Sequence, residues 1–413
     1  MALKEFPERI KRLDVSVGSR PERTRAGELL RESTYVFKYE RDDVDQPAAS
    51  LLMPPTIALY EDGDLFPSMD MNLPEGFLFQ QILEMFPKRR LTKMHLLAMM
   101  GDNAIGRVGF AIPDNEPPRA RQHLDRAMIL RSTADQQFFR DLVDAYLSTG
   151  VGISGVQPKI MVPTRAALPV PDLIVKTAGT DFPGLASNEF LCLSAAKRAG
   201  IAVPGFDLSD DGSILVVDRF DIAEDGSRIG FEDIAALMTL RVHDRLSTRK
   251  YQGSYEAVAQ VISLISSAPA PDLHSFFEQL AFSVMVRNGD AHLKNFAMVY
   301  TSARDARLSP MFDVVTTAIY PFERPGGVMD VDRTLALKWL NGKRHASRAY
   351  PTTDELLAFG RSVCGVSNPR AVVDRIAQAM GDTLHVARAD ERVDKSVLAK
   401  LQDPWHSGMA HAR

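Results

Sequence analysis

Residues 288–295 read NGDAHLKN, and this stretch directly follows an apolar helical run. It places an acid, an imidazole, an amine and an amide within six positions, from Asp290 to Asn295. The stretch alone leaves three interpretations open. Asn-Gly is typical of a turn, Asp and His two positions apart can share a metal ion, and Asp followed five positions later by Asn forms the core of a phosphoryl-transfer loop.

The composition is that of an ordinary globular protein. A chain of 413 residues with 45% hydrophobic and 25% charged content can bury a sizeable core, and its length predicts two or three structural units. With 49 basic and 53 acidic residues it has no global basic field that would indicate direct nucleic-acid binding. Its two cysteines, Cys192 and Cys364, are far apart in sequence, which argues against a disulfide framework and fits a reducing compartment.

The N-terminus is charged and lacks the apolar segment of a secretory signal. No stretch approaches the ~18 apolar residues of a spanning helix. We therefore expect a soluble cytoplasmic protein with no membrane partner.

The first part of the chain, residues 1–120, is predicted to be a mixed α/β subdomain. Strand-like runs at 34–39 and 56–62 alternate with turns, and helical runs follow at 77–86 and 93–101. The polar, proline-bearing stretch 114–125 is the best linker in this half of the chain.

Residues 121–225 form a second, β-rich region. GVGISGVQPKIMVP (150–163) joins a glycine-rich turn to a strand, and PDLIVKTA (171–178) supplies a second strand, so the two predict a hairpin. SNEFLCLSAAKRAG (187–200) has helical periodicity, with Ser187 or Asn188 as the expected N-cap and Gly200 after the last turn. SILVVDRFD (213–221) predicts a third strand.

Residues 226–413 are predicted to form a helical C-terminal lobe. The clearest helix is 271–289, which leads into NGDAHLKN. FAMVY (296–300) and LSPMFDVV (308–315) predict a hairpin whose return strand brings Asp313 back beside that loop. Helices continue through 350–413, and the last eleven residues are expected to fray.

Transfer of a phosphoryl group requires a carboxylate near the acceptor hydroxyl, oxygen ligands for Mg²⁺ and cations on the phosphates. Asp290 is the candidate catalytic carboxylate and Asn295 a candidate Mg²⁺ ligand. Lys294 could neutralise phosphate charge and His292 could brace the loop by hydrogen bonding. Asp313, a carboxylate in an apolar run, needs a cation, and either Mg²⁺ or the side chain of a Lys or Arg would serve.

Lys176, at the end of the strand LIVK, stands where a kinase-like site needs its phosphate-contacting lysine. Glu189, thirteen residues later in the following helix, is placed to be its counter-ion. A surface lysine remains the alternative. The glycines at 150, 152 and 155 permit successive N–H groups to cradle phosphates, although the loop matches neither G-x-x-x-x-G-K-[ST] nor G-x-G-x-x-G in full.

The metal-only interpretation needs a third ligand near Asp290 and His292. His243 and Asp244 are candidates, but their spacing fits no common zinc pattern. The order of glycine loop, strand lysine, helix glutamate, D-x-x-x-x-N and later aspartate is instead that of a protein kinase.

These residues resemble the HipA family, the serine/threonine kinase toxins of bacterial toxin–antitoxin pairs. The matching stretches are ISGVQPK, LIVK, NEFLCLSAAKRAGIAVP, VVDRFD, GDAHLKNF, LSPMFDVV and LALKWLNGK, with NLPEGF (72–77) and GRVGFA (106–111) resembling the family's N-terminal subdomain. The resemblance implies an α+β, two-lobed protein-kinase-like fold with an extra N-terminal α/β subdomain and an all-helical C-terminal lobe.

The resemblance also implies roles for particular residues. It makes Asp290 the catalytic aspartate and Asn295 with Asp313 the Mg²⁺ ligands. The implied ATP-binding residues are Ser154, Gly155, Val156, Gln157, Lys159, Lys176, Glu189, Asp218, Arg219, Phe220, His292, Lys294, Asn295 and Asp313. Family members carry a regulatory serine in the glycine loop, and some carry two in an S-x-S arrangement. Here the first position is Gly152, so Ser154 is the expected autophosphorylation site.

The implied function is an ATP- and Mg²⁺-dependent protein serine/threonine kinase that regulates itself by loop autophosphorylation. An aminoacyl-tRNA synthetase is the substrate class that the resemblance suggests, and a HipB-like helix-turn-helix antitoxin is the expected partner, through which contact with DNA would be indirect. Two alternatives stay open: a small-molecule phosphotransferase sharing the Asp-x-x-x-x-Asn core, and an inactive pseudokinase acting as an interaction or repressor subunit.

Overall fold

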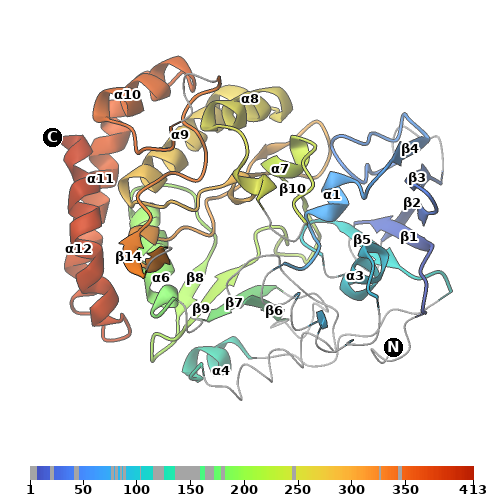
Figure 1. The fold of residues 1–413 in the computed structure, drawn as a ribbon, viewed down its shortest axis with the longest axis horizontal. Helices are drawn as coiled ribbons and strands as arrows, with labels where there is room; N and C mark the ends of the chain where they lie inside the picture. Colours follow the sequence, from blue (N-terminus) through green and yellow to red (C-terminus); the bar gives the residue numbers. More distant parts are fainter. Residues whose placement is uncertain are drawn as a thin grey trace.

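The N-terminal strands lie at one end of the molecule and the C-terminal helices at the other in the computed structural model (Figure 1). No helix in the part of the chain described is long and apolar enough to cross a membrane. The structure describes all residues except 1–6, 19–22, 41–45, 76–78, 80–81, 84–85, 87–89, 103, 115–124, 135–158, 163–171, 178–181, 244–247, 325–326 and 343–346.

The N-terminal region is a five-stranded antiparallel sheet in the order β4-β3-β2-β1-β5. Alternate residues of β1, beginning with Leu13, are buried, as expected for a sheet with one face on a core. The strand predicted at 34–39 and the helix predicted at 93–101 are both present, as β3 and α3. The elements are β1 (Arg12–Val17), β2 (Thr24–Arg31), β3 (Tyr35–Tyr39), β4 (Leu59–Asp62), α1 (Pro67–Asp70), α3 (Lys93–Met100), β5 (Val108–Ala111) and α4 (Arg126–Arg131).

The second region is a four-stranded antiparallel sheet in the order β6-β7-β9-β8. Its first two strands pair as the predicted hairpin. The following helix, α6, has Gly184 at its N-cap and so begins before Ser187 and Asn188, which are buried inside it; those two residues are therefore not the N-cap. The elements are β6 (Lys159–Val162), β7 (Leu173–Thr177), α6 (Leu185–Arg198), β8 (Phe206–Leu208) and β9 (Ile214–Asp218).

The two faces of this second sheet belong to different hydrophobic cores. Leu173 and Val175 on β7, like Ile214 and Val216 on β9, pack in the core of the N-terminal sheet. The intervening β9 residues, represented by Leu215, pack with α6 and the C-terminal helices. The two-residue period of a strand therefore makes this sheet a wall between the two cores.

The C-terminal region is mainly helical. It also contains a small sheet, β10-β11-β12, and a hairpin, β13-β14, so the description of this lobe as all-helical needs correction. Its elements are β10 (Gly230–Asp233), α7 (Ile234–Leu237), η2 (Arg249–Tyr251), α8 (Tyr255–Ile265), α9 (Pro269–Met285), η3 (Leu293–Asn295), β11 (Ala297–Tyr300), β12 (Arg307–Leu308), η4 (Thr317–Ile319), β13 (Pro321–Arg324), β14 (Val328–Val331), α10 (Thr353–Ser362), α11 (Pro369–Ala387), α12 (Lys395–Met409) and η6 (Ala410–Ala412).

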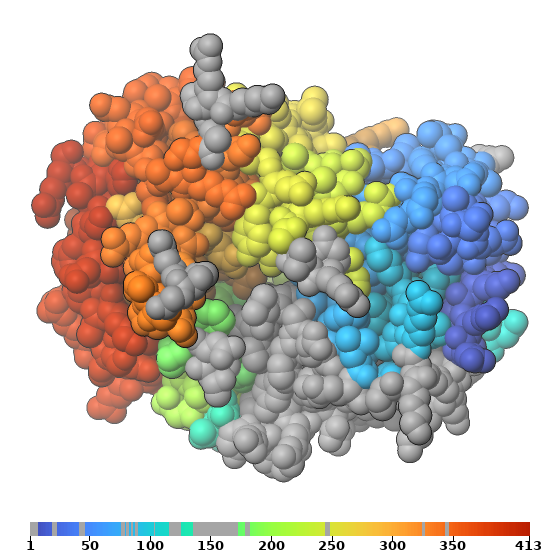
Figure 2. All heavy atoms as spheres, viewed as in Figure 1, coloured from blue at the N-terminus to red at the C-terminus, as the bar shows by residue number. Residues whose placement is uncertain are grey.

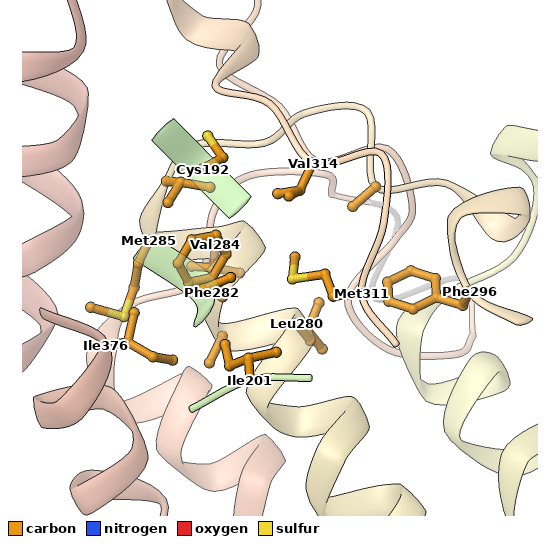
Figure 3. Packing of buried hydrophobic residues seen from close by; sticks show 14 of the residues in the cluster. Cys192, Ile201, Leu280, Phe282, Val284, Met285, Phe296, Met311, Val314 and Ile376 are labelled. Carbon is orange, nitrogen blue, oxygen red and sulfur yellow. The ribbon is translucent and has the colours of Figure 1, made fainter. Parts of the chain in front are cut away.

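Helix α9 runs through the centre of the C-terminal core. Leu280 and Met285 on α9 lie among Cys192 from α6, Ile376 from α11 and Met311 (Figure 3). The C-terminal half of this helix is buried and ends at Met285, two residues short of NGDAHLKN, so the packing of its apolar face fixes where the loop begins.

Buried polar contacts tie the N-terminal region to the C-terminal region. Glu232 on β10 accepts hydrogen bonds from Ser50 Oγ at 2.7 Å, from the Leu51 backbone N–H at 2.6 Å and from the Tyr300 hydroxyl at 2.5 Å. The space-filling view shows the blue N-terminal surface directly against the yellow surface of the C-terminal region (Figure 2). Because the Glu232 carboxylate is 2% exposed, losing these donors would leave it buried and poorly compensated.

Candidate active site

Strand β7 delivers Lys176 into a cleft of about 620 Å³. The side chains of β7 alternate between the two faces of the sheet, so that Leu173 and Val175 enter the N-terminal core while Ile174 and Lys176 line the cleft. The backbone of Lys159 lies directly opposite Lys176 in the register of β6 and β7. The glycine loop precedes β6 in sequence, and Ser154, Gly155, Val156 and Gln157 lie outside the described residues.

Lys176 is held between two carboxylates. Its amino group donates to Glu189 Oε1 at 2.5 Å and to Asp313 Oδ1 at 2.8 Å. Burial alone would lower the pKa of Lys176, but the charges of Asp313 and Glu189 outweigh that effect and raise it, so the side chain stays an ammonium. The predicted counter-ion of Lys176 is thus in place, and the surface-lysine alternative is wrong.

The loop NGDAHLKN is held by local hydrogen bonds where α9 ends. Arg287 has a φ of +57°, which turns the chain out of the helix. Asn288 Oδ1 then accepts from the Asp290 backbone N–H at 3.0 Å, and the Gly289 N–H donates to Thr317 Oγ1 at 2.7 Å. Residues Leu293–Asn295 close the loop as the short helix η3.

The Asp290 carboxylate is engaged by a tyrosine that the sequence did not single out. Tyr251, on η2, donates its hydroxyl to Asp290 Oδ1 at 2.8 Å. A second tyrosine, Tyr255, donates to the backbone carbonyl of Ala291 at 3.0 Å. Both the side chain of Asp290 and the backbone that follows it are therefore fixed from the segment 249–255.

His292 stands beside Asp290 as a neutral ring. Its Nε2 lies 4.0 Å from Asp290 Oδ1, and its Nδ1 has no hydrogen-bond partner within the described part of the chain. Burial, followed by the charge of Lys250, lowers the pKa of His292 well below its ordinary value. The ring contacts Tyr251 edge-to-face at 5.3 Å between centroids. Its side chain therefore braces the loop by packing, whereas hydrogen bonding was expected.

Lys294 reaches out of the loop toward the N-terminal region. Its amino group donates to Glu75 Oε1 at 2.6 Å and to the Met71 carbonyl at 3.3 Å. The side chains of Lys294 and Glu75 are 11% and 5% exposed, so the ion pair is largely buried. Lys294 lines the cleft as predicted, but its charge is already balanced by a carboxylate from another part of the chain.

Asp313 faces the loop from an irregular segment, because β12 ends at Leu308. The predicted return strand over 308–315 is therefore wrong beyond Leu308. Pro310 cannot donate to a strand ladder, and Asp313 has a φ of +55°, a left-handed conformation that Asp tolerates better than most residues. Asn295 Nδ2 donates to the Asp313 backbone carbonyl at 3.2 Å, which joins the two predicted Mg²⁺ ligands.

The segment after Asp313 is held in place through hydrogen bonds to Thr316. Asn188 on α6 donates to the Thr316 carbonyl at 3.0 Å and accepts from the Thr316 N–H at 3.0 Å. Trp405 on α12 donates to Thr316 Oγ1 at 2.8 Å. Helix α6 thus supplies both Glu189 for Lys176 and the clamp that positions the Asp313 segment.

The segment Asp218 to Phe220, whose residues the family resemblance implies in ATP binding, also lines the cleft. Arg126 donates to Asp218 Oδ1 at 2.5 Å, while Arg219 pairs with Asp221 at 2.5 Å. Phe220 lies within 6.0 Å of the ring of Phe231 and 5.5 Å of Phe312, measured between centroids. This apolar cluster provides a surface suited to a flat aromatic group.

Asp233, which the sequence did not indicate, is buried in the wall of the cleft. It caps α7 by accepting from the Ala236 N–H at 2.7 Å. Burial raises the pKa of Asp233 to about 6, and the nearby charge of Lys294 opposes that shift.

The donor set beside the loop suits Mg²⁺. Asp313 brings a carboxylate and Asn295 an amide oxygen, which are the hard oxygen ligands that this ion prefers. Within the described ranges, no three His, Cys, Asp or Glu side chains gather as a metal site. A metal bound by Asp290 and His292 therefore gains no third ligand from His243, and Asp244 lies outside the described residues.

All the described site residues predicted from sequence thus border one cleft, apart from Lys159, whose side chain is not described. Residues missed by sequence reasoning are Lys250, Tyr251, Glu75 and Asp233. None belongs to a motif with a characteristic spacing. Glu75 lies within NLPEGF, which was quoted for its family resemblance without a role for this residue.

A family model described as the HipA-like C-terminal domain matches residues 151–386, which is more than half of the chain. The chain belongs to the HipA family. A second model, the HipA N-terminal domain, matches residues 19–111.

Relatives of this HipA-family chain include two candidate kinases of Sinorhizobium fredii. Y4dM is 29% identical over 176 residues, covering 39% of this chain and 41% of Y4dM. Y4mE is 26% identical over 239 residues, covering 55% of each chain. The chain thus spans about half the length of the curated relatives it matches.

The fold is that of a solved HipA. A chain from the Shewanella oneidensis complex of HipA, HipB and operator DNA matches with a TM-score of 0.68, covering 96% of both chains at 17% identity. This likeness confirms the predicted α+β fold of HipA type.

Proposed function

We propose that this chain is an ATP- and Mg²⁺-dependent protein kinase that phosphorylates serine or threonine hydroxyls. The observation that carries the proposal is the meeting of Lys176, Asp290, Asn295 and Asp313 in one cleft. These are the parts that phosphoryl transfer requires, and they come from separate elements of the chain. Family membership and the kinase names of two relatives support the same activity.

In this proposal, Asp290 accepts the proton of the acceptor hydroxyl while that oxygen bonds to the terminal phosphorus of ATP. The bond from that phosphorus to the bridging oxygen breaks, and ADP leaves. Lys176, fixed by Glu189, contacts the nucleotide phosphates, and the Phe220 cluster receives the base. Asn295 and Asp313 would hold Mg²⁺, which neutralises charge on the phosphate oxygens when bound.

The positions of the charged side chains support a division of the cleft into an acceptor end and a nucleotide end. Asp290 and the neutral His292 stand at the acceptor end, where an uncharged ring avoids competing with the acceptor hydroxyl for the carboxylate. Asp313 and Lys176 stand at the nucleotide end. The positive φ of Asp313 holds its carboxylate in a conformation that the surrounding hydrogen bonds must maintain.

The glycine loop is the proposed site of self-regulation. We propose that Ser154 is autophosphorylated and that Ser154 to Lys159 contact the nucleotide. A phosphoserine there would repel the nucleotide phosphates and weaken ATP binding. Intact-mass measurement after incubation with Mg-ATP tests this proposal: a single phosphate should appear on the wild type and be absent from Ser154→Ala, and a phosphate that persists in the variant contradicts it.

The proposed partners follow the family and its solved relative. A HipB-like helix-turn-helix antitoxin would bind this chain and bring it to DNA, since the Shewanella complex contains HipA, HipB and operator DNA. The proposed substrate is a protein, with aminoacyl-tRNA synthetases as the first class to test. The three regions 1–120, 121–225 and 226–413 are proposed as the structural units, and the cytoplasm as the location.

Labelled ATP and a cell lysate test the activity. Purified chain should label a protein on serine or threonine, and Asp290→Gln should lose that label. Asp305→Asn is the matched control, because Asp305 is an exposed turn carboxylate that accepts hydrogen bonds from Thr301 and Ser302. Labelled small molecules would indicate the phosphotransferase alternative, and no label at all would indicate the pseudokinase.

A further inference from the structure

We infer that Lys250 binds the terminal phosphoryl group of the nucleotide in this cleft. The inference rests on the proposed function and adds a ligand contact that the sequence motifs do not contain. Lys250 lies in η2, directly before the tyrosine that bonds Asp290, and its side chain lines the cleft although the residue is 5% exposed.

The charges of the other cations in the cleft are balanced or exposed. Among the described residues that line it, Lys176, Arg219 and Lys294 have carboxylate partners at 2.5 to 2.8 Å. Arg348 is exposed and donates to a backbone carbonyl. Lys250 alone in this described set is both buried and outside salt-bridge distance of a described carboxylate.

The protein offers Lys250 only a weak substitute for a counter-ion. Its amino group lies 5.3 Å from the centroid of the Tyr251 ring, a cation–π contact. The residue is 5% exposed, so a positive charge with no described carboxylate within salt-bridge distance is only partly compensated by solvent. A ligand that brings negative charge into the cleft would complete this compensation, and the phosphates of a nucleotide are such a ligand.

Position assigns the contact to the terminal phosphoryl group. Lys250 adjoins Tyr251, which bonds the proposed catalytic carboxylate, and its charge acts on His292 in the same loop. The group that passes to the acceptor hydroxyl must lie beside Asp290. In the proposed arrangement Lys176 contacts the phosphates from the nucleotide end of the cleft, so Lys250 lies at the end where the phosphoryl group passes to the acceptor and negative charge shifts during transfer.

Two measurements on Lys250→Met test the inference. Calorimetric titration should show a loss of ATP affinity of roughly tenfold or more, because a charge-assisted hydrogen bond is removed, while ADP affinity changes less than about twofold. Thermal unfolding without nucleotide should occur at a higher temperature than for the wild type, because a largely buried side chain whose charge has no described carboxylate partner has been replaced by an apolar chain of similar length. Arg249→Met, which removes an exposed charge from the same short helix, should change neither quantity.

Each contrary result has a distinct meaning. Equal losses for ATP and ADP, or no loss, would overturn the assignment to the terminal phosphoryl group. A lower unfolding temperature, or failure of Lys250→Met to fold, would overturn it by showing that the ammonium already has a partner in the protein. A wild type that binds neither nucleotide would overturn the proposed function together with the inference. If the wild type prefers ATP, the proposed function stands and the affinities of Lys250→Met decide the inference.

Discussion

Replacing Glu189 by Gln should raise the Mg²⁺ concentration that the proposed ATP binding and phosphoryl transfer require. In the structure one ammonium, that of Lys176, is shared by Glu189 at 2.5 Å and Asp313 at 2.8 Å. The side chains of Lys176 and Glu189 are 5% and 1% exposed, so this pair is scarcely screened by water. With Glu189 neutral, Asp313 becomes the sole anion among these three groups and is held more firmly by the lysine.

The magnitude follows from what Asp313 must give up. In the proposed site Asp313 binds Mg²⁺, and Lys176 can then rely on Glu189. In the variant, recruiting Asp313 leaves the buried ammonium without a carboxylate, a loss of about 1.5–3 kcal/mol for a charged hydrogen bond. At about 1.4 kcal/mol per tenfold change, the half-saturating Mg²⁺ concentration should rise roughly 10- to 100-fold.

The assay is a Mg²⁺ titration of ATP binding by calorimetry, repeated for labelling activity. Activity of Glu189→Gln should recover in large part at high Mg²⁺. Glu278→Gln is the control, since it removes a carboxylate that pairs with Arg375 outside the cleft. If the half-saturating Mg²⁺ concentration is unchanged and only the maximal rate falls, then Glu189 merely orients Lys176, and the reasoning about competition for Asp313 is wrong.

Three further substitutions probe other contacts. Tyr251→Phe removes a donor to the ionised Asp290, so the acid limb of the pH–rate profile should move to higher pH, whereas Tyr255→Phe, which loses a backbone contact, should leave that limb in place; equal profiles for both variants contradict this. The pKa of Asp233 is raised to about 6, so its contribution to stability is present below about pH 4 and lost as pH rises through 6. The difference in unfolding free energy between Asp233→Asn and the wild type should therefore shift by roughly 2 kcal/mol in favour of the variant as the pH rises from 4 to 7. A difference that does not change with pH would refute this. Glu75→Gln leaves the buried Lys294 ammonium without its carboxylate and should lower the unfolding free energy by roughly 3 kcal/mol in denaturant titrations. A decrease below about 1 kcal/mol would contradict this.

Patterns within short stretches of sequence were enough to predict many of the elements and the positions of several cleft residues. The periodicity of α9, the strand LIVK and the helix around Glu189 are all properties of short stretches, and each predicts an element without reference to the rest of the chain. Asp290 and Asn295 are five positions apart, so the turn between them brings both to one loop. The order of motifs then placed Lys176 and Asp313 beside that loop.

Contacts between distant segments could not be read in this way. Glu75 and Lys294 are 219 positions apart, and nothing in either stretch indicates that they pair. Whether a lysine is balanced or unbalanced depends on such packing, which is why Lys250 was not singled out while Lys294 was. Trp405 is another case, because a segment expected to fray contains an indole that is fully buried and bonded to Thr316.

Asp313 lies beside the loop as predicted, but the element that carries it is not the predicted one. The apolar run LSPMFDVV suggested a strand, and a strand would have returned this carboxylate to the loop. The chain instead leaves the sheet after Leu308, and a left-handed residue turns the carboxylate toward Lys176. Positive φ at a residue other than glycine leaves no reliable trace in the sequence.

The wall formed by β6-β7-β9-β8 also limits how this chain can be divided. A fragment beginning at residue 151, where the match to the C-terminal family model starts, would retain Lys176 and its partners but expose Leu173, Val175, Ile214 and Val216. Adjacent apolar side chains on one exposed sheet face form a hydrophobic patch that favours aggregation. The N-terminal sheet therefore covers an apolar face of the half that contains the cleft, and we expect that removing it would make the remaining fragment prone to aggregate.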